Sequence, residues 1–278
     1  MRFLRIFTVI VFVFSLLFAA WESHRYYGNL NTDSPKLTSS EKQLQISVED
    51  PPEAIFRGLT AQDATDGDLT DRIMVASMSH FLEPGTVNVK YVVFDSHNNS
   101  ATLTRRVHYT DYVPPRFTLD KAPVYTVGNS FDLLNYLHVR DCIDGDISDR
   151  VRVVSNMVNN YSAGSYPVLL EVSNSCGDTA QITLWVTYLA KDATACVTLH
   201  EHIVYIPRGE SFAPEKYLAG VTDRNTQPLD RANVQIQGIL DTNTPGSYQL
   251  VYHYDDGKLT GSNTLTIVVT EGGGIDAG

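Results

Sequence analysis

The stretch Asp63-Ala64-Thr65-Asp66-Gly67-Asp68-Leu69-Thr70-Asp71-Arg72-Ile73 occurs a second time as Asp141-Cys142-Ile143-Asp144-Gly145-Asp146-Ile147-Ser148-Asp149-Arg150-Val151. Each copy is followed by a glycine turn, at Gly85 and at Gly164, and a third such turn stands at Gly246. Gly67 and Gly145 are 78 positions apart, and Gly164 and Gly246 are 82 apart. A unit of roughly 80 residues is therefore repeated in tandem.

Runs with an apolar side chain at every second position follow these turns. They include Val87, Val89, Tyr91 and Val93, then Tyr166, Val168, Leu170 and Val172, then Tyr248, Leu250, Tyr252 and Tyr254. Such spacing in β-branched and aromatic residues predicts half-buried antiparallel strands. Several short strands in each unit, with two sheets that must each bury a face, predict a β-sandwich of immunoglobulin type. The expected fold class is all-β, with three tandem sandwiches after an N-terminal membrane-anchor helix.

Length and charge narrow the classes of function. The chain has 278 residues, 43% of them apolar, and a formal net charge of -11. The charge is spread along the chain, and no Lys/Arg cluster could follow a phosphate backbone. Nucleic acid is therefore excluded as an expected partner.

The N-terminus predicts a signal anchor over residues 1–21. Arg2 and Arg5 precede an uncharged run from Ile6 to Trp21. A cleavable signal peptide is the alternative, but Phe18 or Leu17 would then occupy a position where the peptidase needs a small residue. The arginines orient the chain with its C-terminal region outside the cell. We expect a single-pass protein of the cell membrane.

The domain boundaries follow from the repeat. A polar spacer is expected at 22–42, the three immunoglobulin-like domains at 43–112, 113–190 and 191–270, and a flexible tail at 271–278. The third unit diverges where the acidic phrase should stand, because Asp223 is followed by Arg224-Asn225-Thr226-Gln227-Pro228.

This combination of residues resembles the bacterial surface immunoglobulin-like modules, which are related to hyalin-type repeats and to the immunoglobulin-like module of a pesticidal crystal toxin. The residues of the first unit that carry the resemblance are Asp63, Asp66, Gly67, Asp68, Leu69, Thr70, Pro84, Gly85, Thr86, Tyr91, Val93, Asp95, Asn98, Arg105 and Val107. The first unit departs from the pattern at Val87 and His97, and the second has Ser173 where the pattern has the strand-end Asp. The resemblance implies an exported bacterial protein, of Gram-positive type, built from tandem modules.

The clustered carboxylates of the first unit are a candidate calcium site. Asp63, Asp66 and Asp68 lie within six residues around a glycine, and Ca²⁺ prefers several oxygens from one tight loop. In an immunoglobulin-type order Asp95 ends at the same pole of the sandwich, which makes it the expected fourth ligand. The alternative is that these aspartates cap backbone N–H groups of a turn.

Two cysteines of the second unit are a candidate disulfide. The same topology brings the loops of Cys142 and Cys176 to one pole of the sandwich, and Cys196 is left over. Closing this loop without strain would stabilise the domain by about 3.5 to 4 kcal/mol on the chain-entropy estimate. Two buried free thiols are the alternative.

No motif of a catalytic site appears in the sequence. A nucleophile elbow, a paired-histidine zinc helix, a phosphate loop and a Cys-x-x-Cys pair are all missing. We therefore expect a non-enzymatic cell-surface protein, a stalk or adhesion module that binds an extracellular protein or glycan. The alternative is a purely structural spacer or an accessory subunit of an envelope complex.

Overall fold

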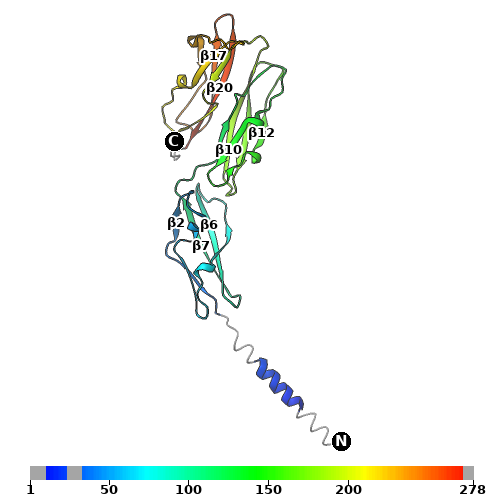
Figure 1. Cartoon of the computed structure of the whole chain (residues 1–278), viewed down its shortest axis with the longest axis vertical. Helices are drawn as coiled ribbons and strands as arrows, with labels where there is room; N and C mark the ends of the chain where they lie inside the picture. The colour runs from blue at the N-terminus through cyan, green and yellow to red at the C-terminus, as the bar shows by residue number, and fades with distance from the viewer. Residues whose placement is uncertain (1–10, 24–32, 272–278) are drawn as a thin grey trace. The chain divides into compact units, whose positions relative to one another are not determined.

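The computed structural model describes residues 11–23 and 33–271. A helix covers 11–23 (Figure 1), and all other long elements are strands. No helix in the described part of the chain combines the length and the apolar character needed to cross a membrane. The anchor predicted for residues 1–21 includes residues 1–10, and these lie outside the described residues.

The strands follow one another in three stretches. The first stretch contains β1 Lys36–Ser39, β2 Gln43–Ile46, β3 Leu59–Asp63, β4 Gly67–Asp68, β5 Met74–Met78, β6 Thr86–Phe94 and β7 Ser100–Tyr109. The second contains β8 Arg116–Leu119, β9 Val124–Thr126, β10 Leu137–Asp141, β11 Gly145–Asp146, β12 Arg152–Asn156, β13 Gly164–Ser173 and β14 Thr179–Leu189. The third contains β15 Cys196–Leu199, β16 Ile203–Pro207, β17 Leu218–Thr222, β18 Val234–Gln237, β19 Gly246–Asp255 and β20 Thr260–Thr270.

Short 3-10 helices connect some of these strands. They are η1 Pro52–Phe56, η2 Thr70–Arg72, η3 Leu133–Tyr136, η4 Ser148–Arg150, η5 Pro214–Tyr217 and η6 Arg231–Asn233. In each of the first two stretches the acidic phrase runs through a two-residue strand, β4 or β11, into a 3-10 helix, η2 or η4.

The described residues form six sheets, two in each stretch. The first stretch has the orders β1-β3-β4 and β2-β7-β6-β5, the second β11-β10-β8 and β12-β13-β14-β9, and the third β15-β17 and β16-β20-β19-β18. Figure 1 labels members of each stretch. The predicted all-β class is confirmed, and paired sheets are what immunoglobulin-like sandwiches require.

The compact units of the chain do not follow the predicted boundaries residue by residue. Residues 45–54, 79–88 and 106 onward form one unit, and the segments between them up to residue 105 form another. The division into domains at residues 112 and 190 stays a prediction.

Alternation along the long strands builds the cores. In β6 the side chains of Val87, Val89, Tyr91 and Val93 are completely buried, as period-two spacing requires when one face of a strand covers a core. The core of the second stretch gathers Phe117, Val139, Ile147, Leu170, Leu184 and neighbouring side chains. The third core is built from Val197, Val221, Tyr252, Leu265, Ile267 and neighbouring side chains.

Candidate functional site

The first aspartate of the acidic phrase closes its own loop. Asp63 Oδ1 accepts hydrogen bonds from the backbone N–H groups of Thr65 (2.8 Å) and Asp66 (2.9 Å). Asp141 repeats the arrangement, because its Oδ1 accepts from the N–H groups two and three residues later. Asp223 accepts from Asn225 and Gln227 although the rest of the phrase is missing there. Capping of a turn is thus the role that all three units share.

The second aspartate connects the acidic loop to the turn that follows the long strand. Asp66 accepts from the backbone N–H (2.6 Å) and the hydroxyl (2.9 Å) of Ser96. Asp144 makes the same pair of contacts with Ser175, at 2.7 and 2.6 Å. The two loops therefore lie at one pole of each sandwich, as the immunoglobulin-type order predicts.

The third aspartate caps the 3-10 helix that follows it. Asp68 Oδ1 accepts from the N–H of Thr70 at 2.9 Å, and Asp146 accepts in the same way from Ser148 at 3.0 Å. Hydrogen bonds from Thr70 lower the pKa of Asp68, and those from Ser96 lower the pKa of Asp66. Both side chains are consequently held as carboxylates that accept hydrogen bonds.

The counterpart of Asp95 in the second unit is Asn174, and the sequence-based pairing with Ser173 is wrong. Asp95 accepts from the N–H groups of His97 (2.8 Å) and Asn99 (2.7 Å). Asn174 occupies the matching place, because its Oδ1 accepts from the N–H of Asp178, four residues later, at 2.9 Å. The loop between the acidic phrase and the glycine turn is one residue longer in the second unit, which displaces the counterpart by one position.

Most carboxylate groups of the four predicted calcium ligands already accept hydrogen bonds from the protein. Asp66, Asp68 and Asp95 direct carboxylate oxygens at the donors described above, whereas Asp63 Oδ2 is buried without a hydrogen-bond partner. Among residues 11–23 and 33–271, no group of three or more His, Cys, Asp or Glu side chains has the geometry to hold a metal ion. The calcium site at Asp63, Asp66, Asp68 and Asp95 stays a prediction.

The cysteines are free thiols in the structure. Cys142 Sγ donates to the backbone oxygen of Val113 at 3.1 Å, and Cys176 is buried while Cys196 is exposed. Burial raises the pKa of both Cys142 and Cys176, which disfavours the thiolate needed for exchange. The Cys142–Cys176 disulfide is therefore not formed here and stays a prediction for the oxidised protein.

Tyr112, which sequence analysis did not single out, organises a buried network beside this loop. Its hydroxyl donates to Asp178 Oδ2 at 2.5 Å and accepts from Asn174 Nδ2 at 3.0 Å. Its ring meets Phe81 edge-on, with centroids 4.6 Å apart, and Phe81 N–H donates to the backbone oxygen of Cys176 at 2.8 Å. Burial, together with the bond to Asp178, raises the pKa of Tyr112 far above its ordinary value.

A second set of contacts joins the last two stretches. The Tyr205 hydroxyl accepts from the Phe117 N–H at 2.8 Å, and the hydroxyls of Thr187 and Thr264 are 2.8 Å apart. Thr187 and Thr264 are buried. Side chains of the third stretch, among them Ile203, Tyr205 and Val268, pack against the core of the second.

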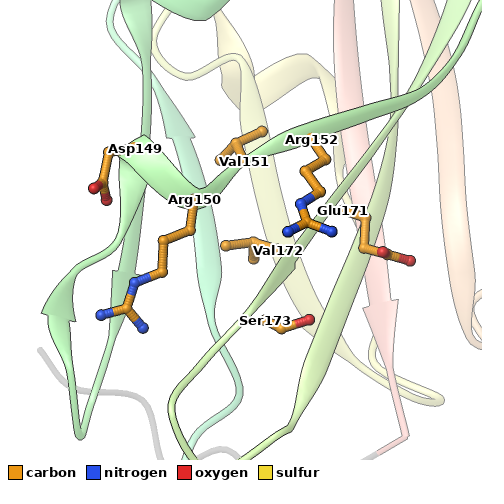
Figure 2. A pocket seen from close by; sticks show the side chains of 7 residues that line it. All are labelled: Asp149, Arg150, Val151, Arg152, Glu171, Val172 and Ser173. Carbon is orange, nitrogen blue, oxygen red and sulfur yellow. The ribbon is translucent and has the colours of Figure 1, made fainter.

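A charged hollow of about 310 Å³ lies beside β12 and β13. Its side chains are Asp149, Arg150, Val151, Arg152, Glu171, Val172 and Ser173 (Figure 2). Arg150 is bound to Asp144 at 2.6 Å, and Arg152 stands opposite Glu171 in the register of the two strands. Because acids balance both arginines, the hollow does not select an anion.

Comparison with known proteins finds similarity to bacterial surface modules in two regions of the chain. A family model described as bacterial surface protein, Ig-like domain, matches residues 43–108 and 199–269. The pesticidal crystal protein Cry22Aa of Bacillus thuringiensis is 26% identical over 222 residues, which cover 76% of this chain and 30% of that protein. An uncharacterized 81.3 kDa protein of Acholeplasma phage L2 is 23% identical over 220 residues, which cover 74% of this chain and 29% of the relative. The chain thus spans less than a third of the length of these relatives.

Solved structures show weak likeness. A structure of CBM51-2 in complex with GlcNAc, with INT domains, from Clostridium perfringens ZmpB has a TM-score of 0.24 at 13% identity, over 85% of this chain and 42% of that one. Drosophila N-cadherin EC1-3 has a TM-score of 0.26 at 12% identity, over 87% of this chain and 91% of that one.

Proposed function

We propose that this chain is a non-enzymatic surface protein that binds an extracellular protein or glycan. The proposal is supported by the match of residues 43–108 and 199–269 to the family model of bacterial surface immunoglobulin-like domains. The chain works as a stalk or adhesion module. Its N-terminal segment anchors it in the cell membrane, in a single pass, and the region after residue 21 lies outside the cell.

The observation that carries the binding role is the exposure of apolar side chains along edge strands. β5 and β12 each stand at the end of a four-stranded sheet. Their exposed apolar residues are Met74, Val75 and Met78 on β5 and Val153 and Val154 on β12, with Met157 just beyond β12. Exposed apolar groups on a free sheet edge favour pairing with another chain. A purely structural spacer gains nothing from them.

The networks around Tyr112 and around Thr187 support the stalk role. The first network links Tyr112 to Asn174 and Asp178, and the second links β14 to β20 through Thr187 and Thr264. Buried hydrogen bonds of this kind are costly to break without replacement. These bonds stiffen the part of the chain that they join, and such stiffness suits a stalk. The alternative, a spacer or an accessory subunit of an envelope complex, shares this stiffness and lacks a use for the exposed edges.

The test is to measure binding of the purified full chain to arrays of extracellular proteins and of glycans. Saturable binding that decreases when Val75 and Val154 are replaced by Glu supports the adhesion role. A chain that binds nothing on either array, but copurifies stoichiometrically with one envelope protein, supports the accessory-subunit alternative.

A further inference from the structure

One core position differs between the three stretches and leaves a cavity in the second. The register opposite the edge strand defines this position: Val75 pairs with Tyr91, Val153 with Leu170, and Ile236 with Tyr252. The inner-strand residues Tyr91, Leu170 and Tyr252 are all buried. They differ in size, because Leu170 is shorter than a tyrosine and has no hydroxyl.

In the first and third stretches the tyrosine reaches a 3-10 helix. Tyr91 donates its hydroxyl hydrogen to the backbone oxygen of Ile55 in η1, at 2.6 Å. Tyr252 does the same to Pro214 in η5, at 2.7 Å. Each ring thus fills the space between its strand and its helix, and the polar tip is satisfied at the far end.

In the second stretch that space is open. A cavity of about 190 Å³ lies between η3 and β12. The apolar part of its lining is Phe131, Leu133, Leu134, Val153, Val168 and Leu170, and the polar part is Asp132 and Asn135. An apolar cavity of roughly 150 Å³ is enough to hold benzene. A hollow beside η5 in the third stretch has a different lining, which includes Phe212 and Leu250 and does not include Tyr252.

We infer that this cavity receives an aromatic side chain of a partner polypeptide. The two sibling stretches show which group fits there, because each places a phenol ring at the matching position with its hydroxyl on the helix backbone. The ring would enter beside Leu134 and Val153, whose side chains are 50% and 46% exposed.

The neighbouring sheet edge suits the rest of that partner. β12 ends its sheet, so its outer N–H and C=O groups face no strand among the described residues. An extended segment can pair with such an edge and place one side chain in a pocket beside it. The inference deepens the proposed binding role, on which it rests for its biological meaning, by naming a protein segment with an exposed Tyr or Phe as the ligand.

The test titrates the full chain with p-cresol, the tyrosine side chain as a free molecule, and follows methyl resonances of Leu and Val. We expect saturable shifts at Leu133, Val153 and Leu170, with a Kd on the order of 1 mM for so small a ligand. Leu170→Tyr, which fills the cavity from inside, should abolish the shifts.

A matched pair of surface variants keeps the test decisive if Leu170→Tyr does not fold. Val153→Glu places a charge in the lining and should weaken p-cresol binding at least about tenfold. Val154→Glu, one residue away and outside the lining, should leave it unchanged. No saturable shift up to about 20 mM, or equal weakening in both variants, would overturn the inference. The proposed function would survive that result if the arrays still show binding.

Discussion

Asn174 Nδ2 donates a hydrogen bond to Asp141 Oδ2 over 3.1 Å. In the first stretch Asp95 stands at the matching place and offers no such donor, so Asp63 Oδ2 is left buried and unpartnered. The residue four positions later is exchanged in the opposite sense, because Asn99 in the first stretch corresponds to Asp178 in the second. An acid and an amide have thus traded places between the two copies.

This exchange predicts that the double variant Asp95→Asn, Asn99→Asp is more stable than the natural chain. The new amide at position 95 supplies the donor that Asp63 Oδ2 lacks, and a satisfied buried acceptor is favourable. We expect the thermal unfolding midpoint of the domain that contains Asp63 to rise by about 4 °C. The single variant Asn99→Asp places a second acid beside Asp95 and should lower it; a rise there would contradict the explanation.

The predicted calcium site has a test that leaves the turn intact. Asp63→Asn keeps the oxygen that caps Thr65 and Asp66 and removes the free carboxylate oxygen. We expect calcium to stabilise the natural chain only at millimolar concentration, since a Kd of roughly 10⁻³ M is typical of weak extracellular modules. Hydrogen bonds from Ser96 and Thr70 also compete with calcium for the carboxylates of Asp66 and Asp68. Thermal unfolding with calcium or chelator measures the effect through linkage. An equal shift in Asp63→Asn would show that these aspartates serve the turn alone.

The Tyr112 network predicts a stability loss for Tyr112→Phe. The change keeps the ring against Phe81 and deletes the hydroxyl, so Asp178 loses a donor and Asn174 loses an acceptor. We expect the free energy of unfolding to decrease by about 1–3 kcal/mol, measured by chemical denaturation. Tyr166→Phe is the control, because its hydroxyl bonds to the exposed backbone oxygen of Ser162; its cost should stay below about 0.5 kcal/mol.

Stability should fall at mildly acidic pH through His202. Burial lowers the pKa of His202, and its Nδ1 atom has no hydrogen-bond partner. The unfolded side chain titrates near 6.5, so the unfolded state takes up the proton first as the pH falls. Stability is complete above about pH 6.5 and decreases below it, down to the lower pKa of the folded state.

The free energy of unfolding, measured between pH 8 and pH 5 in the natural chain and in His202→Phe, tests this effect. The decrease toward acidic pH should be smaller in His202→Phe, because up to one proton fewer is taken up on unfolding. An unchanged slope in His202→Phe would contradict the assignment.

The sequence predicts the strands well because alternation is a local property. The run from Val87 to Val93 reveals its buried face without reference to any partner strand. Spacing from the acidic phrase pairs Asp95 with Ser173, because it ignores a difference in segment length: Gly145 and Gly164 are one position farther apart than Gly67 and Gly85. Counting ten residues from each glycine turn, from Gly85 and from Gly164, leads to Asp95 and to Asn174.

The contacts of Tyr112 and the cavity at Leu170 could not be predicted in the same way. Tyr112 lies in a short segment without a period, and the hydrogen-bond partners of its hydroxyl are more than 60 positions away. Leu170 fits an alternating strand as well as Tyr91 does. The alternation therefore does not indicate that the second stretch lacks the tyrosine ring found at this position in the first. Both features depend on packing between distant segments, which a local pattern does not encode.

Binding of the 278-residue chain to extracellular proteins and glycans is the decisive measurement for the adhesion role. We expect saturable binding to a protein ligand, weakened by Val154→Glu on the exposed edge and by Leu170→Tyr in the cavity, with no chemical change in the ligand. The contradicting result is a chain that binds no member of either class while remaining folded, or one that converts its ligand into a product.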